Sequence, residues 1–354
     1  MHRQRVAVLY GGVSPEHDVS VQSGRSVLEE LPRERYLLIP LLIDRAGRWH
    51  MAREPALPPA WGDADLPDPT RAAGLGAARA LEELQARGVD IIFIALHGHG
   101  GEDGSVQSLL DSASLRYTGS GPAASAIAMR KSLAKAIVRS LGLPVPDSVL
   151  IATERDGDDP AHWHEDKTRF LSFPCFVKPN GAGSSVGTQR IEMRPELPEA
   201  VAKAAAADPE GLVLIEEMIA GRELSAGVIG RRGEERSLPP VEIRPVGRPF
   251  FDYVAKYTPG RAEELCPAPI DGQLEWRVRE MALQIHRALG CEGFSRVDFI
   301  ARDGVPYFLE VNTIPGLTRN SLLPRMAAAE GTSFAELLEQ IVAASRGTRR
   351  GAGD

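Results

Sequence analysis

The sequence predicts a globular protein of two or three domains that combines helices with sheets, beginning with an open parallel sheet. A chain of 354 residues exceeds what one hydrophobic core usually supports. Strand-like runs at 6–10, 37–43 and 89–96 alternate with helix-like segments, which is the pattern of strand–helix–strand units. Gly-rich loops follow two of these strands, at the edge where open parallel sheets bind ligands. A cleft between domains is therefore expected.

Composition excludes several classes of protein. Hydrophobic residues make up 43% and charged residues 25% of the chain, as in ordinary globular proteins. The net charge of -7 gives no general attraction to nucleic acid or anionic lipid, so neither is expected as a partner. Three widely spaced cysteines, Cys175, Cys266 and Cys291, predict neither a disulfide framework nor a zinc site. With no signal-peptide core and no run of about 18 apolar residues, the expected location is the cytoplasm.

The remaining elements follow from local patterns. Segment 49–76 is rich in Pro, Ala and Asp, and is expected to be a surface connection with at most one short strand. Apolar residues recur at helical spacing over 123–141, where Gly142 supplies a stop, so one helix is expected to open the second domain. Later elements are, in order, short strands joined by Gly-rich turns over 173–230, then strands mixed with helices around 274–289 and 334–344.

The strongest local pattern is a hairpin over 293–312, in which two alternating runs flank the turn residues Asp303 and Gly304. If the loop has an odd number of residues, one face carries Arg296, Asp298, Glu310 and Asn312, and the other Ser295, Val297, Phe299, Leu309 and Val311. Two neighbouring carboxylates are unfavourable by up to about 1 kcal/mol unless a cation lies between them. All-oxygen ligands favour Mg²⁺, which also binds nucleotide phosphates and water. The alternative is a solvated polar face on which Arg296 pairs with Asp298.

Two further segments are candidates for nucleotide contacts. A buried-looking strand ends at Lys178, and the loop after it has glycines at 181, 183 and 187, whose backbone N–H groups can approach an anion closely. Because no Walker motif is present, this loop is either a flexible phosphate cover or a plain mobile turn. Near the turn at 220–221, three carboxylates can accept hydrogen bonds from ribose or adenine, or simply solubilise a strand edge: Glu216, Glu217 and Glu223.

The first sheet adds two candidates at the ends of its strands. Ser14 is expected to cap a helix that Pro15 opens, so the carboxylate of Glu16 is also explained by the helix dipole alone. His97 follows a strand and can stabilise an anion, although a lone histidine is more often structural. His97 and His99 have no third metal ligand nearby.

Lysines supply the remaining candidates. Lys131 and Lys135 are one turn apart on the expected helix 123–141, where the simplest interpretation is a solvated basic stripe. Lys256 and Tyr257 lie in a Gly/Pro-bounded stretch that is typical of a mobile lid.

Six segments in sequence order carry a family resemblance: GGVSPEHDVS, ALHGHGGEDGSVQ, VKPNGAGSSVG, DYVAKY, GFSRVDF and LEVNTIPGLTRNSL. Together they resemble the D-alanine:D-alanine ligase family of the ATP-grasp superfamily, over nearly the whole chain from Val6 to about Val342. The resemblance implies an α/β and α+β protein of the ATP-grasp fold. Its expected parts are an N-terminal open parallel sheet domain at 1–122, two α+β domains that clasp ATP at 123–215 and 216–345, and a flexible tail at 346–354.

The resemblance also implies a nucleotide and metal site. ATP phosphates would meet Lys131 and Lys178, under the 181–187 loop with Ser184 and Ser185. Adenine and ribose would be held by Glu216, Glu217, Ile219 and Glu223. Two Mg²⁺ ions, which Mn²⁺ can replace, would be bound by Asp298, Glu310 and Asn312.

The implied reaction is phosphorylation of one D-alanine carboxylate, followed by attack of the amine of a second D-alanine. The first ammonium group would meet Glu16, joined through Ser184 to Tyr257. Lys256 would neutralise the transferred phosphate, and an oxyanion would be stabilised by Arg296 and the N–H of Gly316. The second substrate's carboxylate would be held by Ser321 and Leu322, and the enzyme is expected to be a homodimer.

Three alternatives stay open. The same fold can use D-lactate or D-serine as its second substrate, although Tyr257 favours D-alanine. Another carboxylate–amine ligase would share the acidic hairpin and lack the set of Glu16, Ser184 and Tyr257. An inactive ATP-binding scaffold would be free to lose the lysines and carboxylates that this chain keeps. Arg130 is one departure, because related enzymes usually carry aspartate there, and it puts the fine detail of ATP affinity in doubt.

Overall fold

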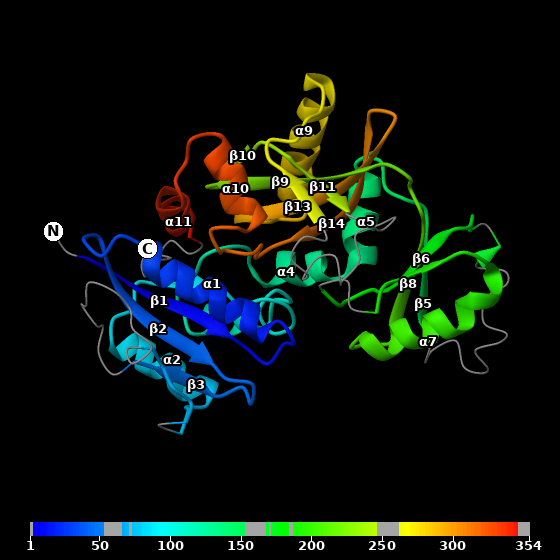
Figure 1. Cartoon of the computed structure of the whole chain (residues 1–354). Helices are drawn as coiled ribbons and strands as arrows, with labels where there is room; N and C mark the ends of the chain where they lie inside the picture. The colour runs from blue at the N-terminus through cyan, green and yellow to red at the C-terminus, as the bar shows by residue number, and fades with distance from the viewer. Residues whose placement is uncertain are drawn as a thin grey trace, which may run out of the picture.

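The computed structural model describes residues 3–52, 66–70, 73–152, 168–169, 171–183, 187–245 and 262–345. Three sheets, each with its own helices, make up these parts of the chain. In Figure 1 the first unit (blue to cyan) lies at lower left, the middle sheet (green) at right, and the third (yellow to red) above them. This combination of α/β and α+β units is the predicted fold class. Within the described ranges, no helix is both long and apolar enough to cross a bilayer.

The first sheet is mainly parallel and has the strand order β3-β2-β1-β4, with only the edge strand β3 antiparallel. Its central strands are buried on both faces, which explains why their sequences are continuously apolar. The three predicted strands are confirmed. The elements are β1 (Gln4–Gly11), α1 (His17–Glu30), β2 (Tyr36–Ile43), β3 (Trp49–Met51), α2 (Ala77–Ala86), β4 (Ile91–Ile94) and α3 (Ser105–Ser112).

The middle sheet is antiparallel, has the order β5-β8-β6-β7, and in the described part of this unit packs against a long helix. That helix, α7, was not expected, because the sequence analysis predicted only strands and turns in this part of the chain. Its sequence LPEAVAKAAAA is rich in alanine, which has the highest helix propensity. The elements are β5 (Ser148–Ala152), β6 (Cys175–Pro179), β7 (Gln189–Ile191), the short helix η2 (Arg194–Glu196), α7 (Leu197–Ala207) and β8 (Leu212–Glu217).

The third sheet is antiparallel in the order β12-β11-β9-β13-β14, with β10 also paired to β9. Helix α9 packs on one face, and α10 and α11 on the other, where they join the core of the first sheet. The close approach of α10 requires Gly227, because a Cβ there would lie 2.5 Å from Leu323 Cδ1. The elements are β9 (Arg222–Gly230), β10 (Arg236–Ser237), β11 (Val241–Pro245), β12 (Ala262–Leu265), α9 (Gly272–Ala288), β13 (Gly293–Arg302), β14 (Val305–Asn312), α10 (Leu322–Ala329) and α11 (Phe334–Ala343).

The single helix predicted over 123–141 is wrong: the segment forms two helices, α4 (Pro122–Met129) and α5 (Lys131–Ser140). The chain leaves helical geometry at Arg130, whose ψ is 95°. Asn180, beyond the end of β6, satisfies the new helix start, since its carbonyl accepts from Lys131 N at 3.0 Å and its Oδ1 from Ser132 N at 2.8 Å. Both helices pack against β14, although they fall within the range expected for the middle unit.

A buried histidine between α9 and β13 makes the fold sensitive to acid. His286 is fully buried, its Nδ1 lies 2.7 Å from Ser295 Oγ, and burial lowers its pKa from 6.5 to about 4. Below about pH 6.5 the unfolded chain therefore binds a proton that the folded chain does not. This contribution to stability is complete above the unfolded pKa and is lost as the pH falls toward 4.

We expect His286→Gln, which keeps a hydrogen-bonding group but cannot titrate, to flatten the pH dependence of stability. Between about pH 7 and pH 5 the parent should lose about 2 kcal/mol more free energy of unfolding than the variant. Urea unfolding of both proteins at the two pH values measures this difference. Equal losses in parent and variant would show that His286 does not titrate in this way.

Candidate active site

The predicted hairpin forms, but its register arises differently from the expectation. The turn contains only two residues, Asp303 and Gly304, both with positive φ (53° and 72°). Sequences in which Asn or Asp precedes Gly favour tight hairpin turns of this kind. A bulge between Asp298 and Phe299 supplies the missing odd residue. Asp298 consequently pairs with Glu310, and both carboxylates lie on one face as predicted. Leu309 was expected on the apolar face; because it is the extra residue, it lines the cleft instead.

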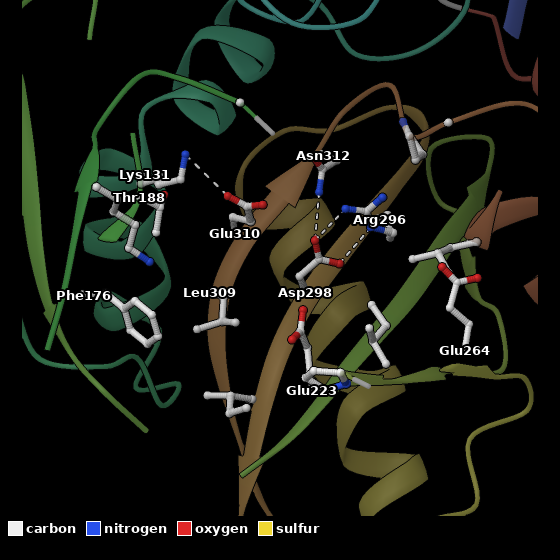
Figure 2. A pocket seen from close by; sticks show the side chains of 18 of the residues that line it. Lys131, Phe176, Thr188, Glu223, Glu264, Arg296, Asp298, Leu309, Glu310 and Asn312 are labelled. Carbon is white, nitrogen blue, oxygen red and sulfur yellow. Dashed lines mark hydrogen bonds and ion pairs between the residues drawn. The ribbon is translucent and has the colours of Figure 1, made fainter. Parts of the chain in front are cut away.

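Asp298 is held in place by several hydrogen bonds on this face. It is 8% exposed, and its oxygens accept from Arg296 Nε (2.8 Å), Arg296 Nη2 (2.7 Å), Asn312 Nδ2 (3.0 Å) and Ser225 Oγ (2.5 Å). Figure 2 shows Asp298, Arg296 and Asn312 turned toward one another. Burial opposes the charge on Arg296, but Asp298 outweighs it and raises the pKa of the guanidinium above its usual range. The pairing of Arg296 with Asp298 thus occurs, on the wall of a cleft and not on a solvated face.

Lysines face this hairpin from α5 and β6. Lys131 Nζ lies 3.5 Å from Glu310 Oε2 and donates to the carbonyl oxygen of Ala182 at 2.7 Å. Lys178 Nζ donates to Glu216 Oε1 at 2.7 Å. Lys131 therefore stands beside Glu310 of the acidic hairpin (Figure 2), and Lys178 lines the same cleft, an arrangement that suits a metal–phosphate complex.

Lys135 does not belong to a solvated stripe. Its side chain is 1% exposed, and its Nζ lies 2.6 Å from Glu216 Oε2. Burial alone would raise the pKa of Glu216, but Lys135 and Lys178 outweigh it and keep that pKa below its ordinary value. The sequence contained no local signal of this pair, because Glu216 lies far along the chain on β8.

The predicted site residues within the described ranges all line one cleft of about 620 Å³: Glu16, His97, Lys131, Lys178, Glu216, Glu217, Ile219, Glu223, Arg296, Asp298, Glu310, Asn312, Gly316, Ser321 and Leu322. This is the volume range of small-molecule sites, which lie preferentially between domains. The other predicted site residues, Ser184, Ser185, Lys256 and Tyr257, lie outside the described residues.

The first unit contributes one side of the cleft. Glu16 lies between two loops, because a Cβ at Gly98 would be 2.6 Å from its Oε2 and a Cβ at Gly183 would be 3.3 Å from it. Helix α1 begins directly after Glu16, later than expected. The expected cap by Ser14 is wrong: the N-cap of α1 is Glu16, and Ser14 Oγ instead accepts from Glu16 N at 3.1 Å in the turn before the helix.

His97 links the first unit to the loop that follows β14. Its Nδ1 lies 3.1 Å from the carbonyl oxygen of Ile314, and its Nε2 lies 2.8 Å from Ser23 Oγ, which itself accepts from Leu317 N at 3.4 Å. A carbonyl only accepts, so Nδ1 carries a proton and donates to Ile314, while Nε2 meets the hydroxyl of Ser23. His97 thereby positions the loop that contains Gly316.

At the far side of that loop, a helix end faces the cleft. Ser321 is the N-cap of α10, which starts at Leu322, and its Oγ accepts from Thr318 N at 3.1 Å. Gly316 is close by, because a Cβ there would lie 2.8 Å from Ser321 Oγ. A helix N-terminus beside free space in a cleft suits a carboxylate.

Apart from Ile219, the apolar part of the cleft was not predicted from the sequence. Phe176, Leu309 and Ile300 line it together with Met218 and Ile219. Phe176 is labelled near Leu309 in Figure 2. The alternation of β6 could have identified Phe176, because it lies two residues before Lys178 and thus on the same face. Such a surface suits a planar base next to the charged phosphate region.

The fold and this cleft define the class: an ATP-grasp enzyme, in which two α+β units clasp a nucleotide. Family models described as D-ala D-ala ligase N-terminus and C-terminus match residues 5–120 and 137–343. The chain belongs to the D-alanine–D-alanine ligase family.

Known relatives match over nearly their full length. The D-alanine–D-alanine ligase of Chlorobium luteolum is 41% identical, and the match covers 97% of each chain. The D-alanine–D-alanine ligase of Oleidesulfovibrio alaskensis is also 41% identical, and the match covers 96% of this chain and 95% of the relative. A D-Ala:D-Ser ligase structure from Enterococcus faecalis superposes with a TM-score of 0.80 at 32% identity, covering 97% of this chain and 99% of that one. The Bacillus anthracis D-alanine–D-alanine ligase complexed with ATP gives 0.75 at 29% identity, covering 96% and 97%.

Proposed function

We propose that the chain joins two D-alanine molecules to D-alanyl-D-alanine, with ATP converted to ADP and phosphate, in the supply of peptidoglycan precursors. The observation that carries this proposal is that the paired carboxylates Asp298 and Glu310 line one cleft with Lys131 and Lys178, and that Lys131 Nζ lies 3.5 Å from Glu310. Glu16 lines the same cleft. D-alanine–D-alanine ligases match nearly the whole chain.

ATP would lie across the middle and third sheets. Lys131 and Lys178 would contact its phosphates, and the base would lie against Phe176, Ile219 and Leu309. The resemblance placed Glu216 with Glu217 and Glu223 at adenine and ribose. Because both oxygens of Glu216 pair with Lys135 and Lys178, we assign the hydrogen bonds to ribose and adenine to Glu217 and Glu223, and Glu216 would hold Lys178 in place. The predicted phosphate cover with Ser184 and Ser185, which lie outside the described residues, would belong to the same site.

The donor set of the hairpin fits two Mg²⁺ ions, or Mn²⁺ in their place. Among the described residues no three His, Cys, Asp or Glu side chains come together, so the protein ligands would be two carboxylates and the Asn312 amide. Mg²⁺ favours one or two carboxylates and takes phosphate oxygens and water for the rest. When bound, it would neutralise charge that develops on the transferred phosphoryl group.

The reacting groups follow from the cleft's remaining walls. Glu16 would bind the ammonium group of the first D-alanine, in a network with Ser184 and Tyr257. A carboxylate oxygen of that D-alanine would attack the γ-phosphorus of ATP. ADP leaves, and Lys256 would neutralise the acyl phosphate. The second D-alanine, held by its carboxylate at the start of α10, attacks the acyl carbon with its amine and displaces phosphate. Arg296 and Gly316 N–H would stabilise the oxyanion.

D-serine is the specific alternative for the second position, because a D-Ala:D-Ser ligase superposes with a TM-score of 0.80. We expect phosphate release with ATP, Mg²⁺ and D-alanine alone. From an equal mixture with D-serine or D-lactate, D-alanyl-D-alanine should exceed the mixed product at least about tenfold, the discrimination that a small difference in pocket contacts gives. Product analysis by mass spectrometry measures this ratio. A mixed product as the main species would assign the chain to the alternative activity.

Family membership also leads us to propose a homodimer that acts in the cytoplasm. Sedimentation velocity would measure the oligomeric state of the purified chain. A monomer that retains full activity would contradict the proposed dimer without affecting the reaction.

A further inference from the structure

A buried lysine next to the cleft has no role in the reaction described above. Lys135 follows Lys131 by one turn of α5, but its side chain is 1% exposed. Its Nζ lies 2.6 Å from Glu216 Oε2, 3.2 Å from the carbonyl oxygen of Phe308 and 5.6 Å from the centre of the Phe308 ring. Burying a charge is costly, and a buried ion pair is often no more stable than apolar residues in its place, so stability alone does not explain a lysine at this position.

Glu216 connects this lysine to the cleft. One of its oxygens meets Lys135 and the other meets Lys178 Nζ at 2.7 Å, while its own side chain is 2% exposed. Two ammonium groups thus share one carboxylate. Because Lys135 takes part of the charge of Glu216, Lys178 keeps more of its positive field for a ligand in the cleft.

The ion pair of Lys135 and Glu216 also connects the third sheet's unit with the middle sheet. Lys135 is on α5, which packs in the core of the third sheet beside β14. Glu216 and Lys178 are on neighbouring strands β8 and β6 of the middle sheet, which has a separate core. An ion pair at this boundary restricts where Lys178 can lie relative to Glu310 on β14, which lines the same cleft.

We propose that Lys135 is a positioning residue that acts through Glu216 to hold the Lys178 ammonium where nucleotide phosphate binds. Burial lowers the pKa of Lys135 to about 8 even with Glu216 beside it, which agrees with an ammonium held at an energetic cost. This inference rests on the proposed binding of ATP. Without the charge of Lys135, Lys178 would be drawn more strongly to Glu216 and less available to a phosphate.

The test is a double-mutant cycle on nucleotide affinity, measured by calorimetry with a non-hydrolysable ATP analogue and Mg²⁺. We expect Lys135→Met to weaken binding about tenfold in the parent, yet less than about twofold when Lys178→Met is already present, because the two lysines act on the same phosphate contact. Lys203→Met, on the exposed face of α7, is the matched control and should leave affinity unchanged. If Lys135→Met does not fold, Lys135→Gln carries the same cycle.

The outcomes separate the inference from the function on which it rests. Unchanged affinity in the folded variant, or equal weakening in the parent and in Lys178→Met, would overturn the positioning role, since a merely structural lysine lowers thermal stability without coupling to Lys178. Absence of nucleotide binding in the parent itself would instead refute the proposed function. A raised KM for ATP with an unchanged KM for D-alanine would support the inference.

Discussion

Glu310→Gln should lower ATP- and D-alanine-dependent phosphate release by about a thousandfold. Glu310 pairs with Asp298 across the hairpin and lies 3.5 Å from Lys131 Nζ. It is therefore expected to bind the metal ion next to the lysine that contacts phosphate. Glutamine keeps the size and one oxygen but removes the negative charge that a divalent ion requires. A contribution of several kcal/mol to the barrier is typical for metal-assisted charge stabilisation. Steady-state phosphate release at saturating Mg²⁺ measures the loss.

The matched control is Glu339→Gln, the same substitution on α11, where the carboxylate pairs with Arg35 on the surface. It should leave the rate within about twofold, since exposed ion pairs contribute little. The Glu310 variant should unfold at a temperature close to that of the parent, because this side chain is only partly buried. Full turnover in Glu310→Gln would refute the metal assignment.

The parts of this site that could be predicted from the sequence are those encoded locally. Alternation along a strand and an Asp-Gly turn are properties of neighbouring residues, so the hairpin and the shared face of Asp298 and Glu310 followed from about twenty letters. The same holds for loops after apolar strands, which placed Glu16 and His97 at the cleft.

The features that escaped prediction depend on partners far along the chain. Leu309 was expected in the core, because the alternation of apolar and polar residues along β14 gives no sign of the bulge that turns it toward the cleft. The break at Arg130 has neither glycine nor proline, and its stabilising partner Asn180 comes from the middle unit. From the sequence, Lys135 was expected to be an exposed basic residue. In the fold, β8 places Glu216 beside it and both side chains are buried. The roles of Ser184 and Tyr257 stay predictions.

Arg296→Lys should lower kcat by about a hundredfold to a thousandfold while nucleotide affinity changes less than about threefold. The guanidinium binds both oxygens of Asp298 through Nε and Nη2, which leaves Nη1 for the oxyanion that forms at the acyl carbon. Lysine has one ammonium group and cannot meet Asp298 in this way and reach a ligand as well. Loss of one such donor typically costs about 3 to 4 kcal/mol of transition-state stabilisation.

Arg302→Lys at the far end of the same strand is the matched control, since that side chain is exposed and contacts Tyr307. Single-turnover rates and analogue affinity, measured on both variants, separate two roles that the parent structure combines. If Arg296 acts on the oxyanion, the rate falls and affinity persists, because Lys131 and Lys178 are the residues proposed to hold the phosphates. If affinity falls as far as the rate, Arg296 serves mainly to hold Asp298 in the metal-binding geometry, and the oxyanion must be stabilised by Gly316 and the metal.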